Sequence, residues 1–465
     1  MKNDYVFEAI VPTHSQTLSQ LRRRALSLPN RLRSIVDDSR FVVTVADLYG
    51  RPLVANERCG SWYIPPELKL ESVQFKSTDG HNGSWAFSSR RLNLGLLGII
   101  EKHNGCVVVD STRRGKRMPD ALSKTVPIWC SVVNQALFPQ RLDAAELYTP
   151  PQVVSRSEQS QIEGRLASFI SELMALELDL QALRKTISKP IRPIWVTQDS
   201  ALPAEIPQYD EFHPVILCTA SRRVVGTEVS EGGYIQGAGD DAESWAHGLT
   251  PALFWNNKEQ LIEGVDEEGA VSIVRTLVHA ASDDDHEPPK LVAPTNNIFI
   301  GRSDGKLLSM PLHGHYDAIL HCSRNPSPMA AHGDLNGVVN YLHLPCGDGK
   351  QGSRDLRKQL HQVEEVLRCY NTAPRVLICC PTGKDLSVGV ALVILSLYVG
   401  DDGAYKSSNA RLRCVTAMTK AYIRKRLSWL MVAMPSANPS RATLQSVNSF
   451  LFSRCSRDKE TSPPL

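Results

Sequence analysis

The chain of 465 residues is 42% hydrophobic and 22% charged, with a formal net charge of +3, which describes a globular protein with room for two or three domains. This charge balance gives no argument for nucleic acid by itself, and no apolar run approaches the roughly 18 residues of a membrane span. Eleven cysteines without a C-x2-C pair exclude a disulfide framework or a cysteine zinc site and indicate a reducing compartment. The N-terminal residues show no signal-peptide core, so we expect a cytoplasmic protein, with the nucleus as the alternative, and no membrane or DNA partner.

The first sixty residues combine a basic helix with a candidate strand. A helix is predicted from about Ser15 to Leu28, carrying the run Arg22–Arg24, and Arg31 and Arg33 follow it. The β-branched run Phe41–Ala46 favours a strand. Arginines on a helix usually form a solvated face, and contact with a nucleic acid is the alternative.

A buried strand followed by a basic loop forms the first candidate binding site. The strand is Cys106–Val109, and a polar glycine-bearing loop, Phe75–Trp85, precedes it in the chain. After Asp110 the loop carries four basic residues: Arg113, Arg114, Lys116 and Arg117. Ligands of open α/β sheets bind at the carboxyl ends of strands, and clustered Arg and Lys suit phosphoryl groups. A surface basic loop without a ligand is the alternative.

Residues 156–243 comprise a structural region followed by a second candidate site. Residues 156–188 have a helical apolar stripe, and strands are expected at Ile194–Val196 and Val215–Cys218. Two glycine steps at Gly237 and Gly239 then deliver three acids: Asp240, Asp241 and Glu243. Adjacent carboxylates can hold Mg²⁺ on a pyrophosphate, or one can act as a general base. Capping of a helix N-terminus is the alternative for these acids.

An acidic, proline-ended run, Ser282–Lys290, is the best domain boundary. Beyond it, short strands (298–300, 318–321, 338–344) alternate with helices (354–369, 416–434), which indicates a compact α/β domain. The last of these helices carries Lys420, Arg424, Lys425 and Arg426. We therefore predict an N-terminal α/β domain of uncertain topology over residues 1–281, a second α/β domain over 290–456 and a flexible tail over 457–465.

The strongest local pattern lies in the second domain. Val376–Cys379 reads as a buried strand, and an apolar helix begins at about Ser387. The loop between them contains Cys380, Thr382, Gly383 and Lys384. Backbone N–H groups at a helix N-terminus make an anion site, and phosphate is the expected anion. An ordinary strand–turn–helix crossover is the alternative.

This second domain resembles the dual-specificity, cysteine-dependent phosphatases. Their Cys-x2-Gly-x2-Arg-Ser loop is matched at Cys380, Gly383 and Ser387, and Leu342–Asp348 is similar to the segment that carries their general acid. Leu386 stands where the phosphatase arginine belongs. Losing that bidentate, charge-assisted contact, worth about 1.5–3 kcal/mol, argues against phosphomonoester hydrolysis but leaves phosphate binding intact.

The whole chain resembles the initiator-tRNA 2′-O-ribosyl phosphate transferases of fungi and plants. The resemblance covers roughly residues 15–455 and rests on five long motifs, at residues 75–81, 110–129, 236–251, 379–387 and 438–448. It implies a pentosyltransferase that moves ribosyl phosphate from phosphoribosyl pyrophosphate to the 2′-hydroxyl of adenosine 64 in initiator methionine tRNA. The mark keeps that tRNA out of elongation. The alternative function is a phosphatase-like phosphate-binding protein or a hydrolase that uses Cys380.

The same resemblance implies a set of site residues within these motifs. The expected catalytic residues are Asp110, Asp240 and Asp241, the last two also as ligands of Mg²⁺ bound with the donor. The expected substrate-binding residues are Lys76, Arg113, Arg114, Lys116, Lys124, Gln236, Cys380, Thr382, Gly383, Lys384, Asp385, Ser387 and Arg441. The 380–387 loop would hold either the donor 5′-phosphate or a tRNA phosphate. The basic helices would contribute to tRNA recognition by shape, phosphates and 2′-hydroxyls.

Overall fold

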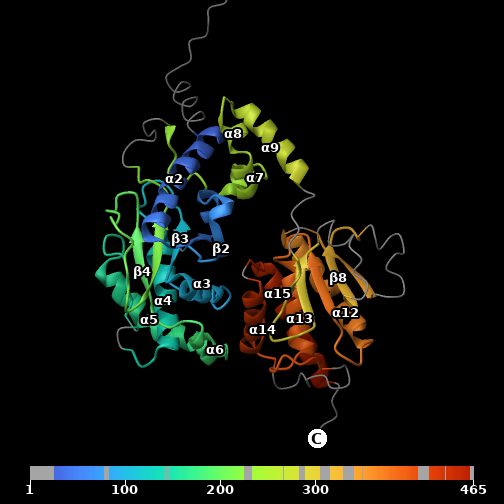
Figure 1. The fold of residues 1–465 in the computed structure, drawn as a ribbon. Helices are drawn as coiled ribbons and strands as arrows, with labels where there is room; N and C mark the ends of the chain where they lie inside the picture. The colour runs from blue at the N-terminus through green and yellow to red at the C-terminus, as the bar shows by residue number, and fades with distance from the viewer. Residues whose placement is uncertain are drawn as a thin grey trace, which may run out of the picture.

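The computed structural model describes residues 26–77, 83–141, 144, 146–224, 233–264, 266–281, 288–303, 315–327, 340–347, 349–406, 418–434 and 436–460. Within these residues the chain builds two five-stranded sheets, each packed against helices (Figure 1). The predicted α/β class is therefore confirmed. The helix expected from about Ser15 to Leu28 falls almost entirely on residues 1–25, which lie outside the described part of the chain.

The first sheet is parallel throughout, with strand order β2-β1-β3-β5-β4. Its strands are β1 (Leu53–Asn56), β2 (Lys69–Val73), β3 (Cys106–Asp110), β4 (Ile191–Val196) and β5 (His213–Thr219). Every residue of the central strands β1, β3 and β5 is buried, as expected of parallel strands covered on both faces. The strands predicted at 106–109, 194–196 and 215–218 are confirmed.

Helices cover both faces of this sheet. One face packs against α3 (Gly95–His103), α4 (Val126–Leu137), α5 (Arg156–Met174) and α6 (Leu180–Lys185). The other packs against α2 (Leu28–Tyr49), α7 (Pro251–Asn256), α8 (Lys258–Ile262) and α9 (Glu267–Ala281). The single helix predicted over 156–188 is two helices, because the chain leaves helical geometry between α5 and α6, where Glu177 has φ 50°.

The strand predicted at Phe41–Ala46 is wrong, since this run lies inside α2. Its buried residues Ile35, Val42 and Val45 recur at helical spacing and face the core. Burial of that stripe outweighs the strand preference of the β-branched residues. Gly50, in the left-handed region with φ 59°, ends the helix.

The second sheet has the order β6-β7-β10-β8-β9, with only β6 antiparallel to its neighbour. Its strands are β6 (Lys290–Leu291), β7 (Ile298–Arg302), β8 (Ala318–Ser323), β9 (Asn340–Pro345) and β10 (Val376–Cys380). One large core joins it to α12 (Gly349–Arg368), α13 (Leu386–Tyr398), α14 (Lys420–Ala433) and α15 (Arg441–Glu460). These elements confirm the predicted alternation, while the domain boundaries themselves stay predictions. A search of the described helices finds none with the length and apolar character needed to cross a membrane.

Candidate active site

The carboxyl edge of the first sheet gathers the polar residues. The chain leaves β1 toward β2 on one side, and after β2 it continues to β3 on the other side of β1. Such a switch point opens a crevice at the carboxyl ends of the two central strands, where open α/β sheets bind ligands. Here those ends carry Asn56 of β1 and Asp110 of β3. The expected position of the basic loop at this edge is confirmed.

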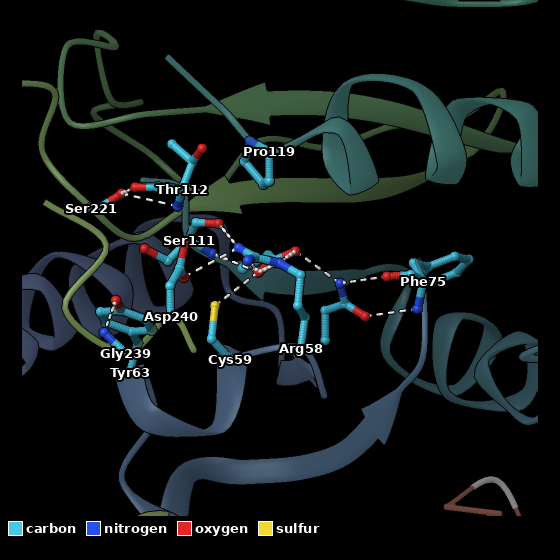
Figure 2. A network of polar contacts seen from close by, with 12 residues as sticks. Arg58, Cys59, Tyr63, Phe75, Ser111, Thr112, Pro119, Ser221, Gly239 and Asp240 are labelled. Carbon is cyan, nitrogen blue, oxygen red and sulfur yellow. Dashed lines mark hydrogen bonds and ion pairs between the residues drawn. The ribbon is translucent and has the colours of Figure 1, made fainter. Parts of the chain in front are cut away.

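Asp110 is completely buried and fully hydrogen-bonded. Its carboxylate accepts from Asn56 Nδ2 at 2.8 Å, from the Ser111 backbone N–H at 2.7 Å and from Cys59 Sγ at 3.1 Å. Asn56 also exchanges two hydrogen bonds with the Phe75 backbone, at 2.7 and 3.0 Å, so it joins the end of β3 to the chain after β2 (Figure 2). The buried charge of Asp110 is thereby compensated.

Arg58 connects the two predicted acids. Its guanidinium donates to Asp110 Oδ1 at 3.2 Å and to Asp240 Oδ1 at 3.3 Å, and it also bonds the Ser111 carbonyl (Figure 2). Residues more than a hundred positions apart thus meet on one side chain. Sequence reasoning missed Arg58, Asn56 and Cys59; the signal was a short apolar run, Leu53–Ala55, that leads directly into them.

The ionisable groups of this cluster shift one another's pKa values. Burial alone would lower the pKa of Arg58, but Cys59 and the carboxylates of Asp110 and Asp240 raise it above its ordinary value. Burial raises the pKa of the Asp240 carboxyl, and Arg58 opposes that rise. Burial, followed by Asp110 and Asp240, also raises the pKa of the Cys59 thiol well above its usual range, so it stays neutral and donates.

Asp240 is held from its backbone as well. Tyr63 OH accepts the Gly239 N–H at 2.8 Å, and Trp245 Nε1 donates to the Asp240 carbonyl at 2.8 Å. Asp241 is exposed, takes φ 51° and begins a short 3-10 turn without a side-chain capping bond. The capping alternative is therefore wrong: the Asp240 carboxylate serves Arg58, and the Asp241 carboxylate points to solvent.

Gln236 anchors the basic loop. Its Oε1 accepts the Gly115 N–H at 3.2 Å, and its Nε2 donates to the Lys116 carbonyl at 2.8 Å. A Cβ on Gly237, which has φ +71°, would approach the Thr112 carbonyl to 2.7 Å, so the acidic segment and the basic loop need a glycine where they touch. The structure thus brings Gln236, the basic loop and Asp240 together.

The other basic residues predicted in the first-domain site differ in exposure and in their partners. Arg113, Arg114 and Lys76 are exposed, and the Lys76 carbonyl accepts from Thr125 Oγ1 at 2.8 Å. Lys124, by contrast, forms an ion pair with Glu158 at 2.8 Å, which ties the π-helical turn Ala121–Thr125 that precedes α4 to α5. This ion pair indicates a structural role for Lys124.

Four buried hydroxyls at this edge have no hydrogen-bond partner among the described residues. They are Ser77 after β2, Ser111 and Thr112 after β3, and Thr219 at the end of β5. Buried polar atoms are rarely left unpaired, and each costs about 1–3 kcal/mol. Their position beyond the carboxyl ends of three strands of the same sheet favours a polar ligand there.

The described residues contain no cluster of three or more His, Cys, Asp or Glu side chains that could enclose a metal. Mg²⁺ seldom needs one, because it is commonly held by one or two carboxylates plus substrate phosphates. Asp240 and the exposed Asp241 fit that partial role. They do not form an all-protein metal cage.

The loop of the second domain begins at the carboxyl end of β10. Cys380 Sγ lies 3.1 Å from Ser387 Oγ and 3.7 Å from Thr382 Oγ1, and Thr382 Oγ1 accepts the Lys384 N–H at 3.2 Å. Gly383 has φ +67°, and a Cβ there would lie 3.1 Å from the Arg302 nitrogen. The strand, loop and helix predicted here are confirmed.

The rest of this loop differs from a phosphatase site. Leu386 packs against the domain core, so no cation occupies the position of the phosphatase arginine. Asp385 accepts the Ser440 N–H at 2.9 Å, and the next residue, Arg441, is exposed at the start of α15. Asp348, in the segment similar to the phosphatase general acid, lies outside the described residues.

The basic helices are less available to RNA than expected. Arg31 of α2 donates to the Ala238 carbonyl at 3.2 Å beside the acidic segment. In α14, Arg426 is completely buried and donates to Asp401 at 2.7 Å, while Lys425 pairs with Glu177 at 2.6 Å. The charges of Lys425 and Arg426 are therefore used in contacts within the protein, and the contribution of this helix to tRNA recognition stays a prediction.

Comparison with known proteins matches both halves of the chain. Residues 21–279 match the family model of the Rit1 N-terminal domain, and residues 340–451 match that of the Rit1 DUSP-like domain. An uncharacterized protein of Schizosaccharomyces pombe is 37% identical over 94% of this chain and 96% of its own length. The tRNA A64-2′-O-ribosylphosphate transferase of Saccharomyces cerevisiae is 33% identical, over 96% of each chain.

Solved phosphatase structures align with the second domain alone. The Yvh1 phosphatase domain of Chaetomium thermophilum is 15% identical over 36% of this chain and 98% of its own, with a TM-score of 0.27. Human DUSP28 is 19% identical over 37% of this chain and 97% of its own, with a TM-score of 0.25. The assignment of the second domain rests on the DUSP-like family model. With both domains matched in order and a relative at 33% identity over nearly its full length, the chain belongs to the Rit1 family of transferases.

Proposed function

We propose that this enzyme transfers 5-phosphoribosyl from phosphoribosyl pyrophosphate to the 2′-hydroxyl of adenosine 64 in initiator methionine tRNA. The activity named for the S. cerevisiae relative supports the reaction class. One observation carries the location: Arg58 joins Asp110 and Asp240 at the switch point of the first sheet. There a cation, two carboxylates and unpaired hydroxyls lie at the carboxyl edge of one sheet.

The donor needs a site that neutralises its phosphates. Arg58 and the backbone of the 111–116 loop supply fixed positive dipoles and charge beside the orphaned hydroxyls of Thr112 and Thr219. Exposed Arg113 and Arg114 add charge at the rim. Mg²⁺ carried by the donor would be held by Asp241, with Asp240 next to it, and would neutralise the pyrophosphate as it leaves.

The two buried acids suit different tasks. Asp110 accepts hydrogen bonds from four groups and is sealed from solvent, so its role is to position Arg58 and Asn56. Asp240 is 11% exposed at its side chain, and burial raises its pKa. A carboxylate with a raised pKa is a better proton acceptor, so Asp240 is the general base of this proposal.

The transfer is one nucleophilic substitution at C1 of the ribosyl group. The C1–oxygen bond to pyrophosphate breaks and the pyrophosphate leaves with the electron pair. The 2′-oxygen of adenosine 64 forms the new bond to C1, and its proton passes to Asp240. Arg58, 3.3 Å from Asp240 in the free enzyme, lies where it can stabilise both the leaving group and the base.

Hydrolysis at Cys380 is not favoured. Leu386, partly buried against the core, stands where a phosphatase places its arginine, so this position offers no bidentate clamp to a phosphate. The loop keeps an exposed Lys384 just before the N-terminus of α13, which supports phosphate binding without cleavage.

Incorporation of label from phosphoribosyl pyrophosphate carrying a radiolabelled ribosyl phosphate tests the proposal. With Mg²⁺ and initiator tRNA, label is expected in the RNA, and none is expected in a tRNA with 2′-deoxyadenosine at position 64. A folded enzyme that labels neither RNA, or both equally, would falsify it. Aryl phosphate hydrolysis measured in parallel, and lost on Cys380→Ser, would support the hydrolase alternative.

A further inference from the structure

The segment Ser436–Ser440, which joins α14 to α15, contacts the first domain after β2 and the phosphatase-like loop of the second domain. On its first-domain side, Gln74 Nε2 donates to the Ser436 carbonyl at 3.3 Å, and Arg91 Nη2 donates to Asn438 Oδ1 at 2.7 Å. On its second-domain side, the Asn438 N–H donates to the Lys384 carbonyl at 2.8 Å. We call this segment the bridge.

The bridge meets the carboxyl edges of both sheets. Gln74 directly follows β2, the edge strand of the first sheet that lies toward α14 and α15 in Figure 1. Its neighbour Phe75 holds Asn56, which holds Asp110. Lys384 belongs to the loop after β10. The ligand-binding edges of the two sheets are thus connected through a single short segment, a placement that a purely structural domain contact does not require.

A cavity opens beside the bridge. It has a volume of about 350 Å³ and is lined by Ser436 and Met434, by Thr382, Gly383 and Lys384 of the loop, and by Lys290 and Arg302. The described residues that line this cavity include three cations, Lys290, Arg302 and Lys384, and no acid. A second pocket at the domain contact is mixed in charge, because Glu71 lines it together with Arg91. The basic charge is therefore concentrated at the cavity beside the 381–384 loop.

Spacing decides which substrate can reach both sites. Asp110 lies on β3, and β2 is two strands away, or roughly 10 Å at ordinary strand spacing. The Gln74 side chain and the bridge add further length before Lys384 is reached. One small donor engaged at Arg58 cannot also fill the loop of the second domain. An RNA helix presents phosphates along its length and can contact both.

We propose that Arg91 and Asn438 are positioning residues that hold the phosphatase-like loop against the first-domain site, so that one tRNA binds across the bridge. In this arrangement the 381–384 loop binds a backbone phosphate of the tRNA, and the donor binds at Arg58. The inference rests on the proposed transferase function for the identity of the RNA. It assigns to the bridge a role in RNA affinity, separate from donor affinity.

Two variants remove the hydrogen bond between Arg91 and the bridge, and a third variant retains it. Arg91→Ala and Asn438→Leu remove the 2.7 Å hydrogen bond, whereas Asn438→Asp keeps an acceptor and adds a charge opposite Arg91. Glu177→Gln is the matched control, because it weakens another contact between the domains, the pair with Lys425 at 2.6 Å, away from both sites. Thermal unfolding of each variant shows whether it is folded.

The measurement is the affinity of fluorescent initiator tRNA without donor, followed by KM for donor and for tRNA. Arg91→Ala and Asn438→Leu are expected to weaken tRNA binding roughly 10-fold, with the double variant no weaker than either single one. Lys384→Ala weakens it similarly. Asn438→Asp and Glu177→Gln bind like the parent protein, and KM for the donor stays within about twofold in all of them.

Unchanged tRNA affinity in the folded Arg91 and Asn438 variants would overturn the inference. So would a rise in donor KM alone, which would place the donor phosphate in the loop, or an equal loss in Glu177→Gln. Because binding is measured without donor, absence of transfer in the parent protein would defeat the proposed function while leaving this inference testable on RNA affinity.

Discussion

The carboxyl edge of the first sheet and the loop of the second domain both begin where a buried parallel strand ends, but they are assembled differently. The first is built from residues far apart in the chain that meet on Arg58, with Asp110 and Asp240 as its partners. The second lies almost entirely within residues 380–387 and is closed by neighbouring backbone and hydroxyl groups. A long-range charge cluster can support chemistry that a local anion loop, lacking its arginine, cannot.

The largest expected effect comes from Arg58→Ala. It removes the charge between two acids and leaves the buried Asp110 without a cationic partner, so transfer should fall at least about 1000-fold and the free energy of unfolding by about 3–5 kcal/mol. Arg58→Lys supplies charge without the planar fork and should recover only part of both. Single-turnover transfer and denaturant unfolding measure the two quantities. Full activity in Arg58→Ala would remove the first site from the mechanism.

Asp240→Asn should lower transfer about 100-fold with little loss of stability, because the amide keeps an oxygen for Arg58. Burial raises the pKa of Asp240. Transfer by the parent enzyme should therefore decline as the pH falls through that raised pKa, at a higher pH than an ordinary carboxylate would give. The variant should show a flat profile over the same range. A decline of the same shape in Asp240→Asn would assign the base elsewhere.

The difference between the two sites also explains what sequence could predict. The 380–387 loop, the 110–117 loop and the acids were recognised because each is a local pattern following an apolar run. Arg58 was not, since β1 has only four residues and nothing near it in sequence marks its partners, 52 and 182 positions away. Lys124 and Arg426 were expected to bind substrate or tRNA for a related reason. Their partners in the fold, Glu158 and Asp401, cannot be identified from a single sequence.

Asp38 is a buried acid outside the Arg58 cluster, and the described residues give it no cationic partner like Arg58 to oppose the effect of burial on its pKa. Burial raises the pKa of Asp38 well above its ordinary range, although Tyr234 OH at 2.8 Å and Gln198 Nε2 at 2.9 Å donate to it. In the unfolded chain it ionises near the ordinary value, so native stability is lost as the pH rises from there through the raised pKa. Asp38→Asn lacks this loss.

The expected result is that Asp38→Asn gains stability relative to the parent protein by about 1–2 kcal/mol between acid and neutral pH. Denaturant unfolding at several pH values measures it, and Asp37→Asn, an exposed neighbour, is the control. A constant difference between parent and Asp38→Asn over this range would show that Asp38 is ionised in the native protein near its ordinary pKa.

The smallest effect is expected at Cys380, the residue that resembles a phosphatase nucleophile most closely. Its thiol lies 3.1 Å from Ser387 Oγ and is almost completely buried, so serine can keep that contact with a slightly smaller atom. Transfer by Cys380→Ser should stay within about threefold of the parent enzyme, since its loss removes one weak hydrogen bond. A phosphatase mechanism would instead lose all turnover, because serine in such a loop is not ionised. Comparing this variant with Lys384→Ala, which should weaken tRNA binding, separates the role of the loop as an anion site from any covalent role of its cysteine.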